Sequence, residues 1–321
     1  MEIETRKQLV KIAIYYYYKN MNQSQIAEKL DLSRTVVSRE LQKAKDLGIV
    51  NIYIHDKSYH ITDMEIQLEE KFGLQKASIV PSFNLSDDET LLSVVHSSIE
   101  IIREQLYHVN NVGVSWGNTL RILAREFPYE KFNHINLIPL IGGMENDYIH
   151  YHSNQICYDL MKKLNCRSNF LYAPAVVKDE QLHNILSRNP HITSILNEGK
   201  QVDLAIVGIS TPDRNGIMKD VGYITNTDME ELSEEKSVGD INSRFFDINA
   251  KEVDSKINNS VIGVGIEDLK NIPLVVGIAS GADKKEAILT SIENKVIDIL
   301  VTDEHVAEYI LSTGPSSDST S

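Results

Sequence analysis

Apolar residues recur at helical spacing in the first fifty residues of the chain. Leu9, Ile12, Ala13 and Tyr16 share one face, which predicts a first helix over residues 3–19. The pattern is that of a small helical unit that buries one side of each helix.

Two further helices are expected across a short turn. In the segment QSQIAEKL, the apolar residues Ile26, Ala27 and Leu30 lie on one face. Asp31 takes the turn, where a left-handed backbone is tolerated by aspartate, and Ser33 is a natural N-cap for the third helix. The stripe expected to be buried in that helix comprises Val36, Val37, Leu41 and Ala44.

The third helix keeps a polar face that suits DNA. Its first two turns hold arginine, threonine and serine, where a recognition helix presents side chains to base edges. A stop at Gly48, followed by the alternating segment IVNIYIHD, predicts the strand of a short wing.

The run Tyr15–Tyr18 is expected to pack in the core or against a partner subunit rather than to stack on bases. The alternatives are a helical subdomain with solvated arginines and a head that contacts another protein. The DNA-binding residues expected are Gln23, Ser24, Ser33, Arg34, Thr35, Ser38, Arg39 and Lys43.

Strand-like and helical patterns alternate through the rest of the chain. The apolar runs are ASIV, NVGVS, INLIPLI, NFLYAP, DLAIVGIS, SVIGVG, LVVGIAS and DILVT. Because these runs are apolar throughout, they predict a parallel sheet covered on both faces, a Rossmann-like α/β fold. The segment SDDE at Ser86 is a capping box that opens a helix to Leu106. We expect a DNA-binding domain over 1–55, a linker over 56–62, an effector domain over 63–312 that opens with a helix at 63–72, and a disordered tail over 313–321.

The net charge also differs between the N-terminal unit and the rest of the chain. The 321 residues carry a formal net charge of -14, of which residues 1–60 hold +3 and residues 61–321 hold -17. An acidic body repels DNA, so contact is expected to be local to the N-terminal unit and repeated across an oligomer. No apolar run is long enough to span a membrane and no signal sequence is visible, which predicts a soluble cytoplasmic protein. Cys157 and Cys166 lack a CxxC partner, which favours free thiols.

Three loops stand where strands lead into helices, the edge at which open α/β sheets bind ligands. The segment VGVSWGNTL can cradle an anion or form a tight turn, and LIGGM permits close approach of a backbone. In ASGADKKEAI, Lys284 sits at a helix start, where a cation costs about 0.3–1 kcal/mol that a bound phosphate would offset. Without a ligand, Lys284 is an ordinary solvated lysine. The residues concerned are Ser115, Trp116, Gly117, Asn118, Thr119, Gly142, Gly143 and Lys284.

Two further segments carry candidate chemistry. GDINSRFFDIN holds Arg244 and Asp247, which suit the phosphate and the hydroxyls of a phosphorylated sugar or else form a structural pair. His150 and His152 flank a tyrosine but lack a carboxylate at ligand spacing, so no metal site is expected.

Taken in order, eight segments resemble the SorC family of bacterial transcriptional regulators, also described as SorC/DeoR sugar-binding regulators. They are QSQIAEKLDLSRTVVSRELQKAKDLGIV, VGVSWGNTL, LIPLIGG, DLAIVGIS, GDINSRFFD, VIGVGIEDLKNIP, ASGADKKEAI and DILVTDEHVAEYIL. The resemblance implies an N-terminal helix-turn-helix, an effector domain similar to sugar-phosphate isomerases, and dimers or tetramers on operator DNA. It also implies a phosphorylated sugar as effector and no cofactor.

By motif match, the resemblance assigns residues to the two ends of the effector. Gly117, Asn118, Thr119 and Lys284 would face its phosphate. The rest of the pocket would be lined by Gly143, Arg244, Asp247 and Asp303. Two positions depart from the family pattern: Ser280 replaces the first glycine before Lys284, which puts the shape of the phosphate site in doubt, and Asp31 replaces the turn glycine.

The function expected is that of a sequence-specific DNA-binding regulator of a carbohydrate operon, controlled by a sugar. A sensor of an unphosphorylated sugar or polyol is the main alternative. A sugar-phosphate isomerase would need a general base such as Asp247 or Glu267, but a fused DNA-binding head serves no isomerase, so we expect no enzyme activity.

Overall fold

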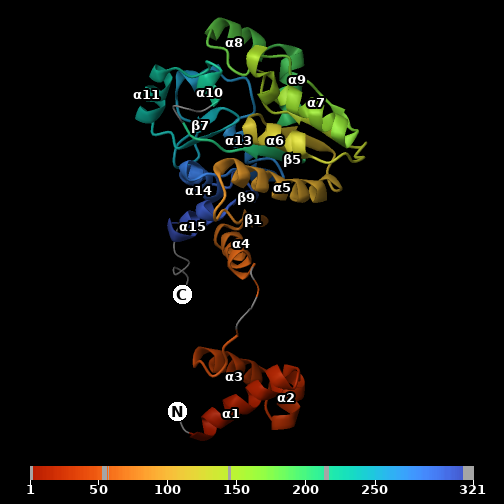
Figure 1. Ribbon diagram of the computed structural model, residues 1–321, viewed down its shortest axis with the longest axis vertical. Helices are drawn as coiled ribbons and strands as arrows, with labels where there is room; N and C mark the ends of the chain where they lie inside the picture. The colour runs from red at the N-terminus through yellow and green to blue at the C-terminus, as the bar shows by residue number, and fades with distance from the viewer. Residues whose placement is uncertain (1–2, 53–55, 57, 144–145, 213–216, 314–321) are drawn as a thin grey trace. The chain divides into compact units, whose positions relative to one another are not determined.

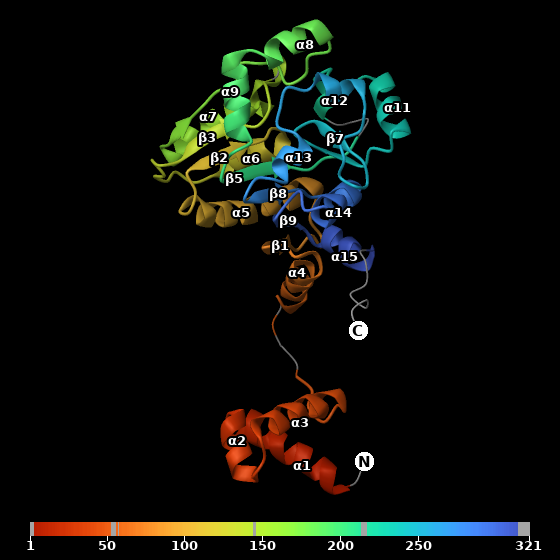
Figure 2. The same ribbon diagram turned by 180° about the vertical axis from the view of Figure 1, so that it is seen from behind.

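The computed structural model describes residues 3–52, 56, 58–143, 146–212 and 217–313 (Figures 1 and 2). The chain divides into two compact units, Met1–Tyr59 and His60–Ser321, which are described separately. Within the described ranges, no helix is long and apolar enough to cross a membrane. The tail expected over 313–321 lies outside these ranges except for Thr313, which ends the last helix.

The N-terminal unit contains the three helices that the periodicity predicts. They are α1 (Ile3–Ala13), which continues as a π-helical turn (Ile14–Tyr18), α2 (Gln23–Leu30) and α3 (Arg34–Asp46). Asp31 adopts the left-handed backbone expected at the turn, with φ 51° and ψ 49°. The Ser33 hydroxyl accepts the Val36 N–H and so caps α3.

Apolar side chains from all three helices form the core of this unit. Ile12, Ile26, Val37 and Leu41 are buried together, and Ala44 is buried farther along α3. Val36, expected inside, is only partly buried. Tyr15 and Tyr17 pack against the core, as expected, but Tyr18 is exposed and so is Tyr16, which was expected on the buried face with Leu9, Ile12 and Ala13.

The wing strand expected after α3 is not formed in its described part, residues 49–52. Gly48 has φ 63°, and the N–H groups of Ile49 and Val50 both donate back to the carbonyl of Ala44. The backbone here therefore completes the end of α3 instead of pairing as a strand. Residues 53–55 of the predicted wing lie outside the described residues.

The second unit is built on a seven-stranded, wholly parallel sheet in the order β1-β9-β8-β5-β2-β3-β4. This confirms the parallel α/β architecture. The strands of the sheet are β1 (Lys76–Val80), β2 (Asn111–Val114), β3 (Asn136–Pro139), β4 (Arg167–Ser168), β5 (Leu204–Gly208), β8 (Val275–Ile278) and β9 (Ile299–Asp303). A separate antiparallel hairpin pairs β6 (Gly239–Ile241) with β7 (Arg244–Phe246).

Helices follow most strands, as the alternating pattern predicts (Figure 1). The helices are α4 (Tyr59–Phe72), α5 (Asp87–Leu106), α6 (Asn118–Glu126), α7 (Ser153–Leu164), α8 (Glu180–Ser187), α9 (Pro190–Gly199), α10 (Ile217–Asp220), α11 (Asn226–Glu234), α12 (Lys256–Ser260), α13 (Ile266–Leu269), α14 (Lys285–Glu293) and α15 (Glu304–Thr313), with short 3₁₀ turns at Asn146–Tyr151 and Ala282–Lys284. Ser86 caps α5 through the predicted capping box with Glu89. The helix expected from residue 63 begins at Tyr59 instead.

Alternate residues of each strand enter two different cores, one on each face of the sheet. Leu204 and Ile206 of β5 pack in the core that also contains residues of α5, α6 and α7. Ala205 and Val207 pack in the core that contains residues of α4, α13, α14 and α15. Burial on both faces explains why the strands read as continuous apolar runs.

Two apolar runs expected to be strands are not strands. NFLYAP lies just after β4, and SVIGVG spans the end of α12 and the residues after it; they join the fold through isolated bridges, including Gly143 with Pro174 and Val176 with Val261. Several of their apolar side chains are buried without belonging to the sheet: Leu171, Ala173 and Ile262 share one small cluster, and Val261 belongs to another, whereas Tyr172 is exposed. Burial in a loop layer and burial in a strand produce the same apolar pattern.

Candidate effector pocket

A cavity of about 290 Å³ lies where the order of the parallel strands reverses. From β2 the chain adds strands on one side of the sheet, β3 and β4, and from β5 it adds β8 and β9 on the other. Loops at the carboxyl ends of such strands diverge and leave room for a ligand. The cavity is lined by Ser115, Trp116, Gly117, Asn118, Thr119, Gly208, Ile209, Ser210, Thr211, Pro212, Met218, Ile224, Asp240, Asn242, Phe245, Asp283 and Lys284.

The loop from β2 to α6 forms one wall, as the sequence indicates. Gly117 has φ 107° and ψ 179°, a backbone conformation that is essentially restricted to glycine, and it caps α6 without a side chain. The first N–H groups of α6 therefore have no partner within the helix. Arg121 donates to Asn118 Oδ1 at 2.7 Å and stacks over the ring of Tyr151. This bond orients the side chain of Asn118 by occupying its oxygen, and it leaves the amide nitrogen available to donate to a ligand.

The loop from β8 to α14 brings Lys284 to the same cavity. Gly281 has φ 109°, and its N–H donates to the buried carboxylate of Asp303 at 2.8 Å. Asp303 also accepts from the N–H of Val306 and so caps α15. Asp303 thus holds the Lys284 loop in place but is not among the residues that line the cavity.

The β6–β7 hairpin forms a wall that the sequence did not reveal. Asp240 and Phe245 are cross-strand partners and both line the cavity, whereas Arg244 pairs with Ile241. Burial raises the pKa of Asp240 to about 7, and the hydrogen bond from the Ser243 backbone and the charge of Lys284 oppose that rise only in part. The turn residue Asn242 is buried, and its Oδ1 has no hydrogen-bond partner among the described residues. No local pattern in the segment DINSRF indicates that Asp240 faces the cavity.

Besides Asp303, four predicted residues do not line the cavity. The guanidinium of Arg244 donates to the carbonyls of Asn258, Val261 and Gly263, and its carboxylate neighbour is Glu252 at 3.6 Å. Asp247 accepts from the N–H groups of Asn249 and Lys251 and so forms a local turn. An added Cβ would lie 2.4 Å from the Pro174 oxygen at Gly142 and 2.6 Å from the His152 ring at Gly143. Both glycines therefore permit close packing of the backbone. The residues outside the lining are Gly142, Gly143, Arg244, Asp247 and Asp303.

The polar face of α3 is presented to solvent as the sequence predicts. Arg34, Thr35, Ser38 and Arg39 are all exposed, as is Lys43 farther along the helix. Arg39 keeps 72% of its side chain exposed although it approaches Glu40 at 3.4 Å. Gln23 starts α2, and Ser33 is engaged as the cap of α3.

Comparison with known proteins identifies the family to which the chain belongs. A family model described as "Putative sugar-binding domain" matches residues 56–312. The sorbitol operon regulator of Klebsiella pneumoniae is 30% identical over 305 residues, which cover 94% of this chain and 97% of the relative. The chain belongs to the SorC family. Its relatives are named as regulators of transcription and not as enzymes, and this SorC-family chain is a transcriptional regulator.

Two solved structures share the fold of this SorC-family chain. The full-length sorbitol operon regulator SorC from Klebsiella pneumoniae aligns with a TM-score of 0.73 and 30% identity over 95% of this chain and 98% of that one. A DeoR family transcriptional regulator from Listeria monocytogenes aligns with a TM-score of 0.74 and 44% identity over 78% of this chain and 99% of that one. The two candidate bases of an isomerase, Asp247 and Glu267, both lie outside the lining of the cavity.

Proposed function

We propose that this SorC-family regulator binds operator DNA through α3 and that a phosphorylated sugar in the cavity controls that binding, without a cofactor. The observation that carries the proposal is the meeting of the α6 N-terminus with Lys284 at the strand-order reversal. A helix N-terminus offers unpaired N–H groups and partial positive charge, and the lysine adds a full one.

The phosphate end of the effector is assigned to the loops that carry Gly117 and Lys284. Asn118 and Thr119 are the first residues of α6 and line the cavity, so their backbone N–H groups and the side-chain amide nitrogen of Asn118 would donate to the phosphate. A phosphate also accounts for a lysine in the 3₁₀ turn that precedes α14, a position that is otherwise unfavourable for a cation.

The sugar end is assigned to the hairpin wall. Asp240 provides a buried acceptor for hydroxyl groups, and so does the Oδ1 of Asn242, which has no hydrogen-bond partner in the described part of the chain. Ser210 and Thr211 add hydroxyls from the β5 loop, and Ser210 is held to Asp240 by two backbone hydrogen bonds. A pocket of few polar groups with apolar neighbours such as Trp116 and Phe245 suits a small polyhydroxylated ligand.

The DNA end of the proposal rests on α2, the turn and α3. Two short helices joined by a three-residue turn, with the second capped and its outer face polar, have the arrangement of a helix-turn-helix. The exposed arginines of α3 are placed to contact base edges and its lysines to contact phosphates.

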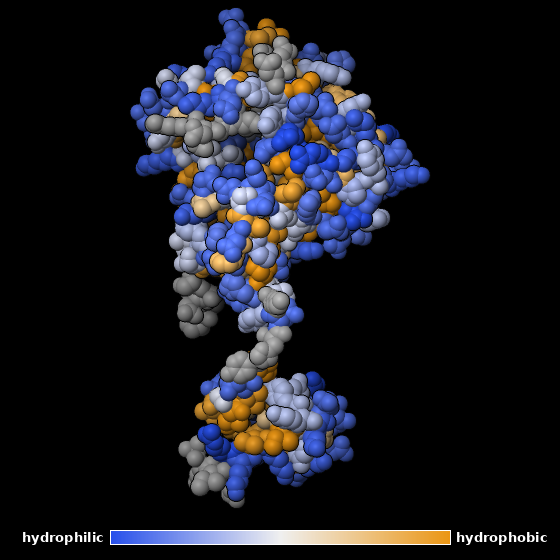
Figure 3. Space-filling model, in the orientation of Figure 1, coloured by the Kyte–Doolittle hydropathy of each residue, from blue (hydrophilic) through white to orange (hydrophobic). Residues whose placement is uncertain are grey.

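We also assign this regulator to homo-oligomers, either dimers or tetramers. The N-terminal unit exposes apolar side chains, among them Val10, Ile14 and Leu47, and Figure 3 shows hydrophobic surface on this unit. A second copy would cover such surface and would present a second α3 to the operator.

An unphosphorylated sugar or polyol is the second candidate for the effector. Among the described residues of the lining, two carry carboxyl groups, Asp240 and Asp283, and one is a cation, Lys284. That balance suits a neutral ligand if Asp240 is ionised, and a phosphate if Asp240 is protonated.

The DNA proposal is tested with duplexes selected by the full-length protein from a random pool. Replacing Arg34 or Arg39 with alanine should weaken binding to the selected site about 5- to 150-fold, the effect of about 1–3 kcal/mol per base-contacting arginine. Arg188→Ala is the matched control, because it removes an exposed arginine that lies at the C-terminal end of α8, outside the N-terminal unit. Equal affinities for all four proteins in fluorescence anisotropy would show that α3 does not read the operator.

A further inference from the structure

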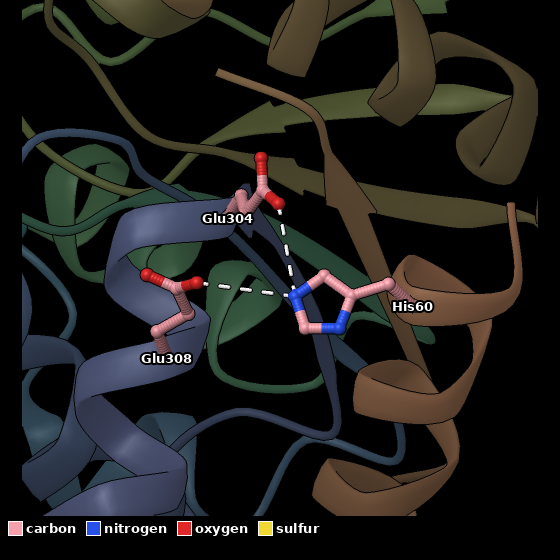
Figure 4. A group of neighbouring side chains, drawn as sticks. All are labelled: His60, Glu304 and Glu308. Carbon is pink, nitrogen blue, oxygen red and sulfur yellow. Dashed lines mark ion pairs between the residues drawn. The ribbon is translucent and has the colours of Figure 1, made fainter. Parts of the chain in front are cut away.

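A histidine and two glutamates meet outside the effector pocket. His60 lies in the first turn of α4, and Glu304 and Glu308 lie one turn apart on α15. His60 Nε2 is 3.8 Å from Glu304 Oε1 and 3.9 Å from Glu308 Oε1 (Figure 4). Each residue offers a ligand atom within 4.8 Å of the other two. All three residues belong to the second compact unit.

The second oxygen of each carboxylate has a neighbour of its own. Glu304 Oε2 accepts from the N–H of Ser82 at 3.3 Å, and Glu308 Oε2 lies 3.8 Å from Nδ1 of His305. Glu304 therefore turns its Oε1 to His60 while a backbone N–H holds its Oε2, as outer hydrogen bonds do for ligands in metal sites, and Glu308 turns its Oε2 toward His305. The Ser82 hydroxyl is buried and has no hydrogen-bond partner among the described residues, so a polar group next to Glu304 is left to be satisfied.

The separations are slightly wider than those of a bound ion. Three atoms within 4.8 Å of one another leave a point within about 2.8 Å of each, against about 2.0–2.2 Å for zinc bound to nitrogen and oxygen. The side chains of His60 and Glu308 are 63% and 52% exposed and can move inward, while Glu304, at 19%, is held by Ser82. An inward shift of at most about 0.6–0.8 Å per ligand closes the site.

We propose that His60, Glu304 and Glu308 bind a divalent transition-metal ion, Zn²⁺ before Mn²⁺. An imidazole nitrogen with two carboxylates suits these ions, whereas Mg²⁺ takes oxygen ligands and keeps its waters. Glu304 and Glu308 are like charges four residues apart on one helix, a repulsion that the ion removes. The bound ion joins the first turn of α4 to the first two turns of α15 and so fixes the start of the helix with which the sugar-binding body begins.

The test is calorimetric titration of the tag-free, chelator-treated full-length protein with ZnCl₂, MnCl₂ and MgCl₂. One Zn²⁺ per chain should bind, more tightly than Mn²⁺, with Mg²⁺ weakest. His60→Gln and Glu308→Gln should each weaken Zn²⁺ binding at least about tenfold. His96→Gln removes a histidine that contacts one glutamate, Glu126, at 3.5 Å, and should leave binding unchanged.

A second readout separates this site from adventitious binding. Zn²⁺ should raise the thermal unfolding midpoint of the wild type and of His96→Gln but not of His60→Gln, because only binding to the native site stabilises the fold. Zn²⁺ binding that survives unchanged in His60→Gln overturns the proposal. So does Mg²⁺ binding as tight as that of Zn²⁺, since that is the behaviour of a nonselective acidic surface.

Discussion

Asp240 is a buried carboxyl in the lining of the cavity, and its protonation changes the charge of the pocket. Its carboxyl is buried, and burial raises its pKa to about 7. Lys284 and the N–H of Ser243 favour the ionised form, but they do not compensate for the loss of water. Near neutral pH the group therefore exists in both forms, and it can donate a hydrogen bond to a hydroxyl or accept one.

Asp240→Asn should change how the stability of the protein depends on pH. The folded state binds the Asp240 proton more tightly than the unfolded state, so the wild type loses stability as pH rises from about 4 to about 7. The asparagine variant lacks this loss, and its free energy of unfolding relative to the wild type should rise over that interval by up to a few kcal/mol and then level off.

Urea unfolding at a series of pH values measures this difference. Asp283→Asn is the matched control, because it removes an exposed carboxyl of the same cavity. A difference curve for Asp240→Asn as flat as that of the control would mean that Asp240 is not held protonated by burial.

At the scale of elements, the β6–β7 hairpin determines which side chains reach the cavity. Its two-residue turn is Asn242-Ser243, and both residues have positive φ, 54° and 60°. Two-residue turns of this type favour asparagine and then glycine. Ser243 is strained at the second position, is fully buried, and has a hydroxyl without a partner among the described residues.

Ser243→Gly should therefore stabilise the protein. Relief of the left-handed strain, about 1–2 kcal/mol, exceeds the entropy that glycine adds to the unfolded chain, about 0.5–1 kcal/mol. The expected gain is about 1 kcal/mol in the free energy of unfolding by urea. Ser93→Gly, within α5, should instead destabilise, because glycine is a poor helix former. If both substitutions destabilise equally, the turn is not strained.

The sequence predicts elements well where one physical signal dominates. Ser33 and Ser86 cap helices in the structure as predicted, and the runs that became β5, β8 and β9 are apolar because both faces of the sheet are covered. It fails where two structures share one pattern: NFLYAP and SVIGVG are buried in a loop layer rather than in the sheet.

The sequence predicts the parts of the candidate site that follow strands directly, but not the residues that only tertiary packing brings to the cavity. The loops that carry Asn118 and Lys284 follow strands, so their place at the sheet edge could be inferred. Asp240 and Asn242 reach the same cavity through a three-residue strand whose register no local pattern reveals, and Arg244 turns away for the same reason. His60 and Glu304 lie more than 240 positions apart, so their meeting depends wholly on the packing of α4 near α15.

For the whole molecule, the central question is how an acidic chain binds DNA under the control of a sugar. The N-terminal unit, which we propose contacts DNA, carries +3 within residues 1–60, and the body carries -17. On this proposal, local attraction at α3, repeated across an oligomer, would give specific contacts while the body disfavours loose binding. An effector that binds one arrangement of the oligomer better than another shifts the balance between them, and operator DNA must change the affinity for that effector by the same factor.

The most direct test is thermal unfolding of the full-length protein against a panel of sugar phosphates and their unphosphorylated parents. A ligand that binds the native state raises the midpoint. We expect one sugar phosphate to raise it, its parent sugar to have no effect, and the shift to disappear in Lys284→Ala but persist in Lys285→Ala, whose lysine lies over the ring of Tyr309 and not in the cavity. A shift produced only by unphosphorylated sugars or polyols, or one that survives in Lys284→Ala, would contradict the assignment of the phosphate to Asn118, Thr119 and Lys284.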